Sequence, residues 1–421
     1  MGKTYFKRVI DSHIKKLLRS SGAVLIEGPK WCGKTRTARE IAASAVFMQD
    51  PQKGPAYRKS AEVMPSSLLE GPTPRLIDEW QIAPVLWDAV RFEVDERGEM
   101  GQFILTGSAV PGDDKARHSG TGRISRALMR PMSLFESMES NGCVSLRSLF
   151  DGAADVRGES SLSIRDLAFA LVRGGWPGAV GMSGDDALGQ IRNYVEATVN
   201  ADVSEVDGVR RNPAAVRELM RSISRNVSSP ANMSTIRGDM SGDGGAVSDK
   251  TVSAYMNALR RIYVVEDLPA WNPSLRSKTA VRSSPKRHFV DPSIAAASLR
   301  ISDKGLMQDF DTFGLMFESL CVRDLRVYAQ ALDGDVYHYR DRNGLEADAV
   351  VHLRDGRWGA IEVKMGSREI EEAAANLIKL RDMVDAERSG APSFLMVLTA
   401  EDRAYRRADG VLSVPIGCLR D

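Results

Sequence analysis

The chain has few of the residues that build disulfide frameworks and zinc sites. It holds four cysteines in 421 residues, and no two of them form a C-x-x-C motif. Its five histidines are scattered, with no pair at metal-ligand spacing, which argues against a zinc site. A low cysteine count is typical of a reducing compartment, so we expect a cytoplasmic protein.

Long apolar runs and a one-sided charge are also missing. No stretch approaches the ~18 apolar residues of a membrane span, and the charged segment 1–20 lacks the apolar core of a signal peptide. We therefore expect no membrane partner. The formal net charge of +1 gives no general attraction to nucleic acid, although it does not exclude a local basic patch.

The length predicts several domains, because single cores stop growing at about 250–300 residues. We expect three: residues 1–138, 139–305 and 306–421. In the first, apolar runs of strand length alternate with amphipathic helical segments. This pattern predicts a three-layer α/β domain with a parallel sheet, whose ligand binds beyond the carboxyl ends of the strands. The predicted strands are 23–26, 75–80 and 102–109, and the predicted helices are 6–19, 35–43 and 82–94.

A phosphate-binding motif lies between the first strand and the next helix. The stretch GPKWCGKT, residues 28–35, fits G-x-x-x-x-G-K-[ST] in full. In such a loop the glycines let backbone N–H groups face the phosphates of ATP, and the helix N-terminus adds positive potential. Lys34 would reach the β/γ-phosphates and Thr35 would bind Mg²⁺; the alternative is a plain βα turn. The predicted nucleotide-binding residues are Gly28, Pro29, Lys30, Trp31, Cys32, Gly33, Lys34, Thr35 and Arg36, with Cys32 as a loop filler.

Two acidic residues end the second strand. Asp78 is expected to hold Mg²⁺ with Thr35, and Glu79 is expected to polarise the attacking water. The alternative is a solvated acidic strand end. We expect the strand that ends in Thr106, Gly107 and Ser108 to lie between the two motifs, where the Ser108 hydroxyl, or less favourably that of Thr106, would orient the water.

Arginines follow in the segment 118–136. Phosphoryl transfer often needs an arginine, from the same chain or from a neighbouring subunit. Arg123 is our first choice over Arg126 and Arg130. Action in trans would require a homo-oligomer, and the alternative is a solvated helix face.

The middle of the chain reads as mostly helical over 163–227, as a loop over 228–248 and as a helix from 248 that runs into a strand. Ser248 or Asp249 is the expected N-cap. Two helices followed by a strand suggest a winged helix. A basic segment follows, and it predicts either a phosphate-contacting wing on DNA or a basic docking surface. Its residues are Arg276, Lys278, Arg282, Lys286 and Arg287, flanked by Trp271 and His288.

The chain resembles bacterial and archaeal AAA-type ATPases that carry a C-terminal domain of unknown function. The resemblance rests on LIEGPKWCGKT, RLIDEW, FILTGSA, GRISRALMRPMSLFE, RGGWPGAV, YVEATVNADV, SDKTVSAYMNALRRIYVVEDL, HFVDPSI and EADAVVHLRDGRWGAIEVK. It implies an ATPase domain, a helical and winged-helix middle, and an α/β end similar to PD-(D/E)-x-K nucleases. One departure is Ala201-Asp202, where the family usually has a basic-acidic pair.

Acidic residues on predicted strands of the last domain fit that nuclease-like end. The period of two places Glu362 and Lys364 on one face, and the Asp355-Gly356 turn brings Asp348 near them. Asp348 and Glu362, with Glu318 as a further acid, would hold Mg²⁺ or Mn²⁺, and Lys364 would position a water. The alternative is a solvated face or a cross-strand ion pair.

Two functions follow from these motifs. The first is a Mg²⁺-dependent ATPase whose nucleotide state controls a DNA-facing, nucleolytic C-terminal half. The second is a nucleotide-dependent switch or scaffold that binds a protein partner and has an inert nuclease-like end.

Overall fold

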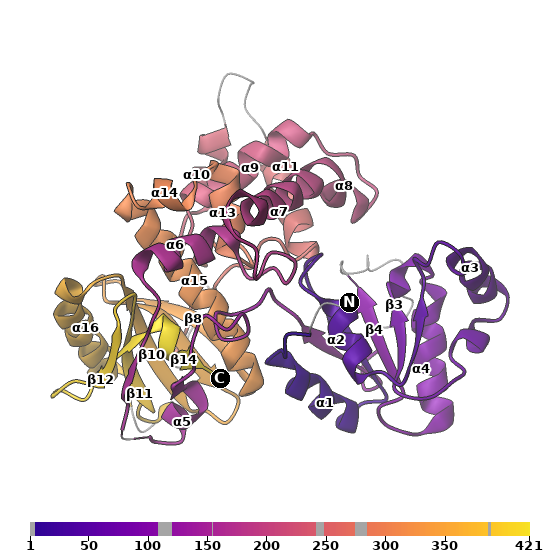
Figure 1. The fold of residues 1–421 in the computed structure, drawn as a ribbon, viewed down its shortest axis with the longest axis horizontal. Coiled ribbons are helices and arrows are strands. Elements are labelled where there is room, and N and C mark those ends of the chain that lie inside the picture. The colour runs from indigo at the N-terminus through magenta and orange to yellow at the C-terminus, as the bar shows by residue number, and fades with distance from the viewer. Residues whose placement is uncertain (1–4, 108–119, 154, 241–247, 274–283, 386–388) are drawn as a thin grey trace. The chain divides into compact units, whose positions relative to one another are not determined.

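The computed structural model describes residues 5–107, 120–153, 155–240, 248–273, 284–385 and 389–421 (Figure 1). The chain divides into two compact units, which are described separately. Unit 1 comprises Met1–Pro131, Asp202–Arg210 and Ala258–Tyr263; unit 2 comprises Met132–Ala201, Arg211–Asn257 and Val264–Asp421. The division of the sequence into three domains stays a prediction.

A five-stranded parallel sheet forms the core of unit 1. Its strands lie in the order β2-β3-β4-β1-β5. They are β1 (Ala23–Glu27), β2 (Ser44–Phe47), β3 (Arg75–Asp78), β4 (Phe103–Gly107) and β5 (Ile124–Leu128). The helices are α1 (Ile10–Ser20), α2 (Lys34–Ile41), α3 (Gly54–Val63) and α4 (Val85–Arg97), with 3₁₀ turns at Pro65–Leu68 and Trp80–Ile82. β4 lies between β1 and β3, which confirms the predicted strand order around the two motifs.

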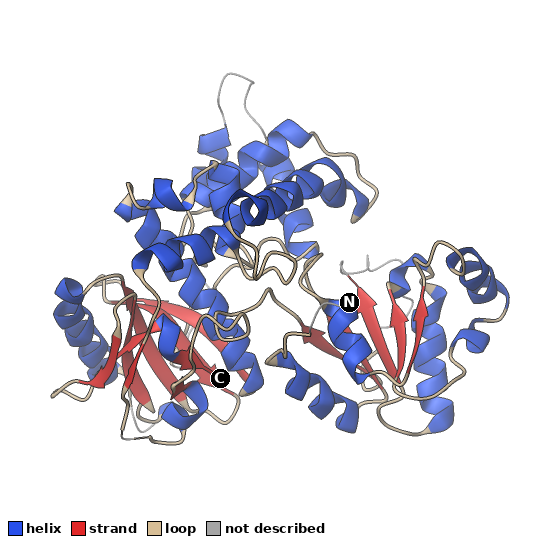
Figure 2. Cartoon of the chain, in the orientation of Figure 1, coloured by secondary structure: helices blue, strands red, loops and turns tan. Residues whose placement is uncertain are grey.

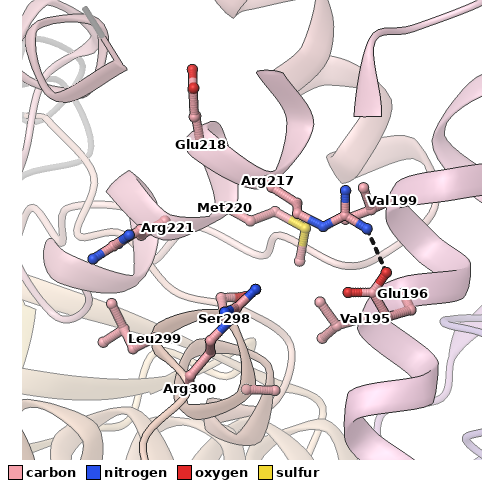
Figure 3. Close-up of a pocket in the computed structure, with 11 residues that line it drawn as sticks. Val195, Glu196, Val199, Arg217, Glu218, Met220, Arg221, Ser298, Leu299 and Arg300 are labelled. Atoms are coloured by element: carbon pink, nitrogen blue, oxygen red, sulfur yellow. Dashed lines mark hydrogen bonds and ion pairs between the residues drawn. The ribbon is translucent and has the colours of Figure 1, made fainter. Parts of the chain in front are cut away.

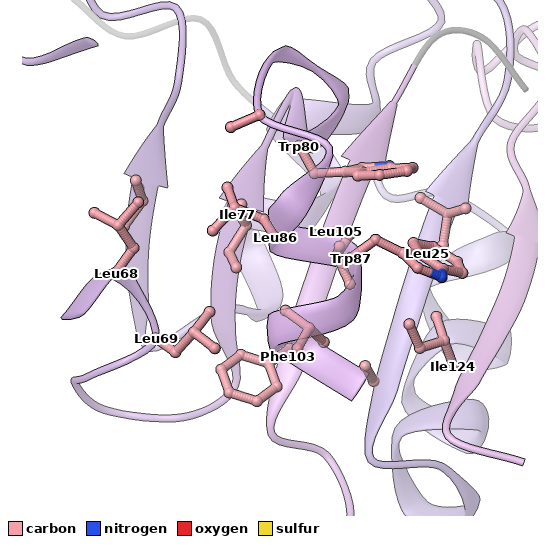
Figure 4. Close-up of a cluster of buried hydrophobic side chains, with 14 of the residues drawn as sticks. Leu25, Leu68, Leu69, Ile77, Trp80, Leu86, Trp87, Phe103, Leu105 and Ile124 are labelled. Carbon is pink, nitrogen blue, oxygen red and sulfur yellow. The ribbon is translucent and has the colours of Figure 1, made fainter. Parts of the chain in front are cut away.

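Helices cover both faces of this sheet (Figure 2). Leu25 of β1 packs in a cluster with Leu105 of β4 and Trp87 of α4 (Figure 4). Its neighbours Val24 and Ile26 belong to a second cluster, with residues of α1 and α2. Because successive strand residues point to opposite faces, one strand contributes to both cores. The three-layer α/β prediction is confirmed for this unit.

Helices form one part of unit 2. They are α5 (Leu146–Phe150), α6 (Ile164–Arg173), α7 (Gly184–Ala197), α9 (Pro213–Arg225), α10 (Met233–Met240), α13 (Pro292–Leu299) and α14 (Asp303–Leu306). The short helix α8 (Val203–Glu205), which belongs to unit 1, follows a π-helical turn at Thr198–Asp202. Helix α11 covers Asp249–Arg261 and has residues in both units. Within unit 2, α13 packs against α6, α7 and α9.

The segment 228–248 is not all loop, because α10 occupies part of it. Its Ser, Gly and Asp residues hid the helix, whose Ile236 and Met240 are buried. The N-cap prediction is confirmed at Ser248, whose hydroxyl accepts a hydrogen bond from Thr251 N at 3.2 Å. The winged helix stays a prediction: isolated bridges such as Val265↔Phe289 follow the helices, and residues 274–283 lie outside the described part.

The remainder of unit 2 is a seven-stranded sheet in the order β7-β12-β13-β11-β10-β9-β8. Helix α15 (Phe310–Ala331) packs on β8, β9 and β10, and helix α16 (Ile370–Met383) packs on β9, β10 and β11. The strands are β7 (Gly158–Glu159), β8 (Gly334–Arg340), β9 (Glu346–Leu353), β10 (Trp358–Lys364), β11 (Phe394–Thr399), β12 (Arg403–Arg406) and β13 (Leu412–Pro415). A two-residue strand β14 (Leu419–Arg420) pairs separately with β6 (Val144–Ser145). The sequence predicted β8–β11 but not the strands after them.

Candidate functional site

The phosphate loop joins β1 to α2 and requires its two glycines. Gly28 has φ +148°, and a Cβ there would lie 2.1 Å from the carbonyl oxygen of Met129. Gly33 has φ +103° and immediately precedes α2. Any larger residue at Gly28 would collide with backbone, so the sharp turn out of β1 depends on this glycine.

Lys34 lies inside the loop that precedes it. Its side chain is buried, at 6% exposure. Its ammonium donates to the carbonyl oxygens of Gly28 at 2.9 Å and Pro29 at 2.7 Å. The positive charge is therefore held where the loop and the N-terminus of α2 meet, which is the arrangement that favours a phosphate.

Asp78 at the end of β3 connects the phosphate loop to the central strands. Its Oδ1 accepts the hydroxyl of Thr35 at 2.7 Å and the hydroxyl of Thr106 at 2.7 Å. Thr106 Oγ1 also accepts the backbone N–H of Glu79 at 3.2 Å. Contacts from the start of α2 and the end of β4 therefore hold the Asp78 carboxylate and the Glu79 backbone in place.

Glu79 occupies a strained backbone position, with φ 56° and ψ 49°. A non-glycine residue in this left-handed region costs free energy and is frequently found at functional sites. Its carboxylate accepts a hydrogen bond from Gln81 Nε2. Burial raises the pKa of Glu79 above its ordinary value, and the nearby Lys34 ammonium partly offsets the rise. A half-buried carboxyl with a raised pKa next to a phosphate loop fits the role of general base.

The remaining loop residues differ in their surroundings. Trp31 is 53% exposed, and the Cys32 thiol donates to Met129 O at 3.4 Å in the interior, as expected of a filler. Arg36 pairs with Glu40 one helical turn away at 2.8 Å.

Lys30 has an acidic partner that sequence reasoning missed. Its ammonium contacts Asp202 Oδ1 at 2.6 Å, and Glu205 Oε2 lies 3.6 Å away. Asp202 ends the π-helical turn, a local irregularity that is common at functional sites. The Ala201-Asp202 sequence was the only signal of this contact, and we had read it as a departure from the family pattern.

Arg123 lies at the end of the sheet opposite the phosphate loop. Its carbonyl oxygen accepts the N–H of Ala23, the first residue of β1, and its side chain pairs with Asp95 at 2.9 Å. This position does not favour Arg123 as a residue that acts within its own chain, because the loop follows the last residue of β1; the choice of Arg123 stays a prediction. Arg126 lies nearer: it pairs with Glu27, the last residue of β1, at 3.0 Å. Ser108 lies outside the described residues, while Thr106 makes the contacts given above.

The predicted carboxylates of the C-terminal sheet do come together, around lysine side chains. Lys286 Nζ lies 2.7 Å from Glu318 Oε1 and 2.9 Å from Asp348 Oδ1, and Lys364 Nζ lies 3.1 Å from Glu362 Oε2. The β9–β10 ladder ends at Ile361↔Ala349, and beyond it Asp348 Oδ2 accepts the N–H of Val363 at 2.9 Å. We call Glu318, Asp348, Glu362, Lys286 and Lys364 the carboxylate cluster.

Burial and neighbouring charges shift the pKa values of the acids of this cluster in different directions. Burial and, second, the charge of Asp348 raise the pKa of Glu318 and that of Glu362 to about 8. The pKa of Asp348 is lowered despite its burial, because Lys286 and Lys364 stabilise its ionised form. In the described part of the chain, no group of three or more His, Cys, Asp or Glu side chains is placed to hold a metal ion. The metal site predicted from these acids is not found.

The predicted basic segment is only partly a surface. Lys286 and Arg287 are 5% and 4% exposed, and Arg287 pairs with Asp267 at 2.8 Å. Trp271 and His288 are buried as well. Lys286 and Arg287 therefore cannot form the phosphate-contacting wing that was one of the two predictions for this segment, because their side chains are enclosed. Arg276, Lys278 and Arg282 lie outside the described residues.

A cavity of about 290 Å³ opens between α7, α9 and α13 of unit 2 (Figure 3). Arg217 at its wall pairs with Glu196, whereas Arg221 and Arg300 form no ion pair with any described residue. Val195, Val199, Ala297 and Leu299 add an apolar lining. Glu196 and Glu218 also line the cavity, so its wall carries charges of both signs. No sequence motif indicated this cavity.

No helix in the described part of the chain is long and apolar enough to cross a membrane.

Three segments of the chain match known protein families. Residues 20–138 match an AAA domain, residues 164–305 match a domain of unknown function (DUF8612), and residues 313–419 match another (DUF4143). Uncharacterized proteins of Mycobacterium bovis and Mycobacterium tuberculosis are each 24% identical over 365 residues, covering 86% of this chain and 74% of their own. A Walker-type ATPase of Pyrococcus abyssi aligns at 15% identity with a TM-score of 0.42, over 70% of this chain and 96% of that chain. With the parallel sheet and its phosphate loop, the match over residues 20–138 supports an ATP-binding and ATP-hydrolysing domain of the AAA type.

Proposed function

We propose that this protein is a Mg²⁺-dependent ATPase whose nucleotide state acts as a switch on a protein partner. The observation that carries the proposal is the contact of the Thr35 hydroxyl with Asp78 at 2.7 Å. It joins the residue after the phosphate-loop lysine to the acid at the end of β3.

The residues around this contact fit Mg²⁺ and the triphosphate of ATP. Gly28 lets the loop turn closely past the backbone of Met129, and Lys34 supplies a buried ammonium. Thr35 and Asp78 would hold Mg²⁺, which when bound neutralises charge on the β- and γ-phosphates.

Glu79 acts as the general base on the attacking water. Its raised pKa keeps the carboxylate basic enough to take a proton while Lys34 favours the ionised form. Thr106 is a positioning residue, because it binds both the Asp78 carboxylate and the Glu79 backbone. The ion pair between Lys30 and Asp202 stabilises the phosphate loop.

ATP turnover by the full-length protein tests this proposal, with Lys34→Ala as the blank. Phosphate release that the blank lacks supports it. Equal release by both proteins would remove the phosphate loop from the mechanism.

DNA control of a nucleolytic C-terminal half is the second candidate. The adjacency of Asp348, Glu362 and Lys364 favours it, whereas the burial of Lys286 and Arg287 counts against contact of these two residues with DNA. Turnover with and without double-stranded DNA separates the two. Stimulation by DNA, with metal-dependent cutting lost in Asp348→Ala, would select the nuclease; indifference to DNA would select the protein switch.

A further inference from the structure

The ammonium group of Lys286 is buried and contacts acidic side chains. Its ammonium lies between two carboxyl groups from different elements, Glu318 of α15 and Asp348 of β9. The flanking backbone is fixed, because Lys286 and Leu268 exchange N–H···O bonds in both directions, at 3.0 and 2.9 Å. The hydrogen bonds between the backbones of Lys286 and Leu268 therefore orient the Lys286 side chain toward the carboxylate cluster.

The residues that follow Lys286 have different partners, which supports a fixed orientation of the Lys286 side chain. Arg287 turns the other way and pairs with Asp267, whereas His288 Nδ1 lies 3.1 Å from Ser319 Oγ, next to Glu318 in sequence. Two successive basic residues are thus buried in separate acidic environments. Only the first of them reaches the carboxylate cluster.

Both oxygen atoms of Asp348 and one oxygen of each glutamate in the cluster already have partners. Asp348 accepts from Lys286 with one oxygen and from the N–H of Val363 with the other. Glu318 accepts from Lys286, and Glu362 pairs with Lys364. A divalent cation would need these same oxygens and would lie against two ammonium groups, so the residues do not fit a metal.

We infer that the Lys286 ammonium takes the place of a divalent metal in the carboxylate cluster, and that it ties residues 284–290 to α15 and β9 as a structural counter-ion. The C-terminal domain is therefore not a metal-dependent nuclease. This inference goes beyond the proposed ATPase and does not depend on it, because no phosphate-loop residue takes part.

Mn²⁺ binding to the full-length protein, followed by the loss of the free-ion electron paramagnetic resonance signal without nucleotide, tests this inference. Wild type and Asp348→Asn should bind the same number of ions. Lys286→Ala, which removes the ammonium and leaves its acidic partners, should bind one ion more, and Lys286→Ala with Asp348→Asn should lose that ion again. Arg287→Ala is the matched control, equally buried but paired with Asp267, and should gain no ion.

Two results would overturn the inference. One is an ion that wild type binds and Asp348→Asn loses. The other is a folded Lys286→Ala protein that gains no ion. If Lys286→Ala does not fold, the comparison of wild type with Asp348→Asn still decides whether the native cluster holds a metal.

Discussion

The hydroxyl of Thr35 donates to the carboxylate of Asp78 across 2.7 Å, although 43 residues separate them in sequence. The contact is possible because β4 and β1 place the ends of β3 and the phosphate loop at one edge of the sheet. The two motifs therefore form one site.

Lys34→Ala should abolish ATP turnover. The variant loses the buried ammonium that the loop surrounds, and we expect a fall of at least ~100-fold, the size seen when one stabilising donor is removed. Phosphate release measures it, and circular dichroism checks the fold. A variant with the parent rate would show that the loop does not serve hydrolysis.

Glu79→Gln should bind ATP but turn it over at least ~100-fold more slowly, as expected for loss of a general base. Because burial raises the pKa of Glu79 above the ordinary 4.5, wild-type kcat should rise with pH over a range higher than an exposed glutamate would give. Residual turnover of Glu79→Gln should lack this rise. An unchanged pH profile in the variant would assign the titration to another group.

Thr106→Val should lower kcat and leave KM for ATP nearly unchanged, because Thr106 positions Asp78 and Glu79 without reaching the substrate itself. Thr106→Ser keeps the hydroxyl and should restore most of the rate. Steady-state kinetics measure the split. If both substitutions are equally harmful, packing rather than the hydroxyl is what matters.

Arg126→Ala should reduce turnover more than Arg123→Ala, since Arg126 pairs with Glu27 beside the loop and Arg123 pairs with Asp95 at the opposite end. Both substitutions remove a guanidinium group, one from β5 and one from the residue that precedes β5, so each variant is a matched control for the other. If Arg123→Ala is the more harmful, mixing it with Lys34→Ala chains should be tried. Recovered turnover there would mean that Arg123 acts in trans.

The stability of unit 2 should fall as pH rises from about 5 to about 8. Glu318 and Glu362 have pKa values raised to about 8 in the folded chain against an ordinary 4.5. The folded state therefore binds more protons than the unfolded state over this range, and its contribution to stability is lost as pH passes the folded pKa. Chemical denaturation at several pH values measures the slope, which should be smaller in Glu318→Gln. An equal slope in wild type and variant would contradict the raised pKa.

The sequence predicted the features that depend on local order. A glycine-bearing loop between an apolar strand and a helix has one main use, so Lys34, Thr35 and the parallel sheet could be read directly. Period-two spacing likewise placed Glu362 beside Lys364, and the Asp-Gly turn placed Asp348 near both. Sequence spacing did not separate Arg123 from Arg126, because a strand has two ends and the spacing does not say which end faces the site.

What the sequence determined by itself was the phosphate loop, its acidic partner strand and the gathering of the C-terminal acids. Only the tertiary structure decided that Lys30 meets Asp202 and that Lys286, predicted to lie on a basic surface, enters the carboxylate cluster. The reason is physical: the sequence identifies a lysine but does not show whether water or acidic side chains surround its ammonium group. Its partners lie 32 and 62 residues away, and only the packing of α15 and β9 brings them to it.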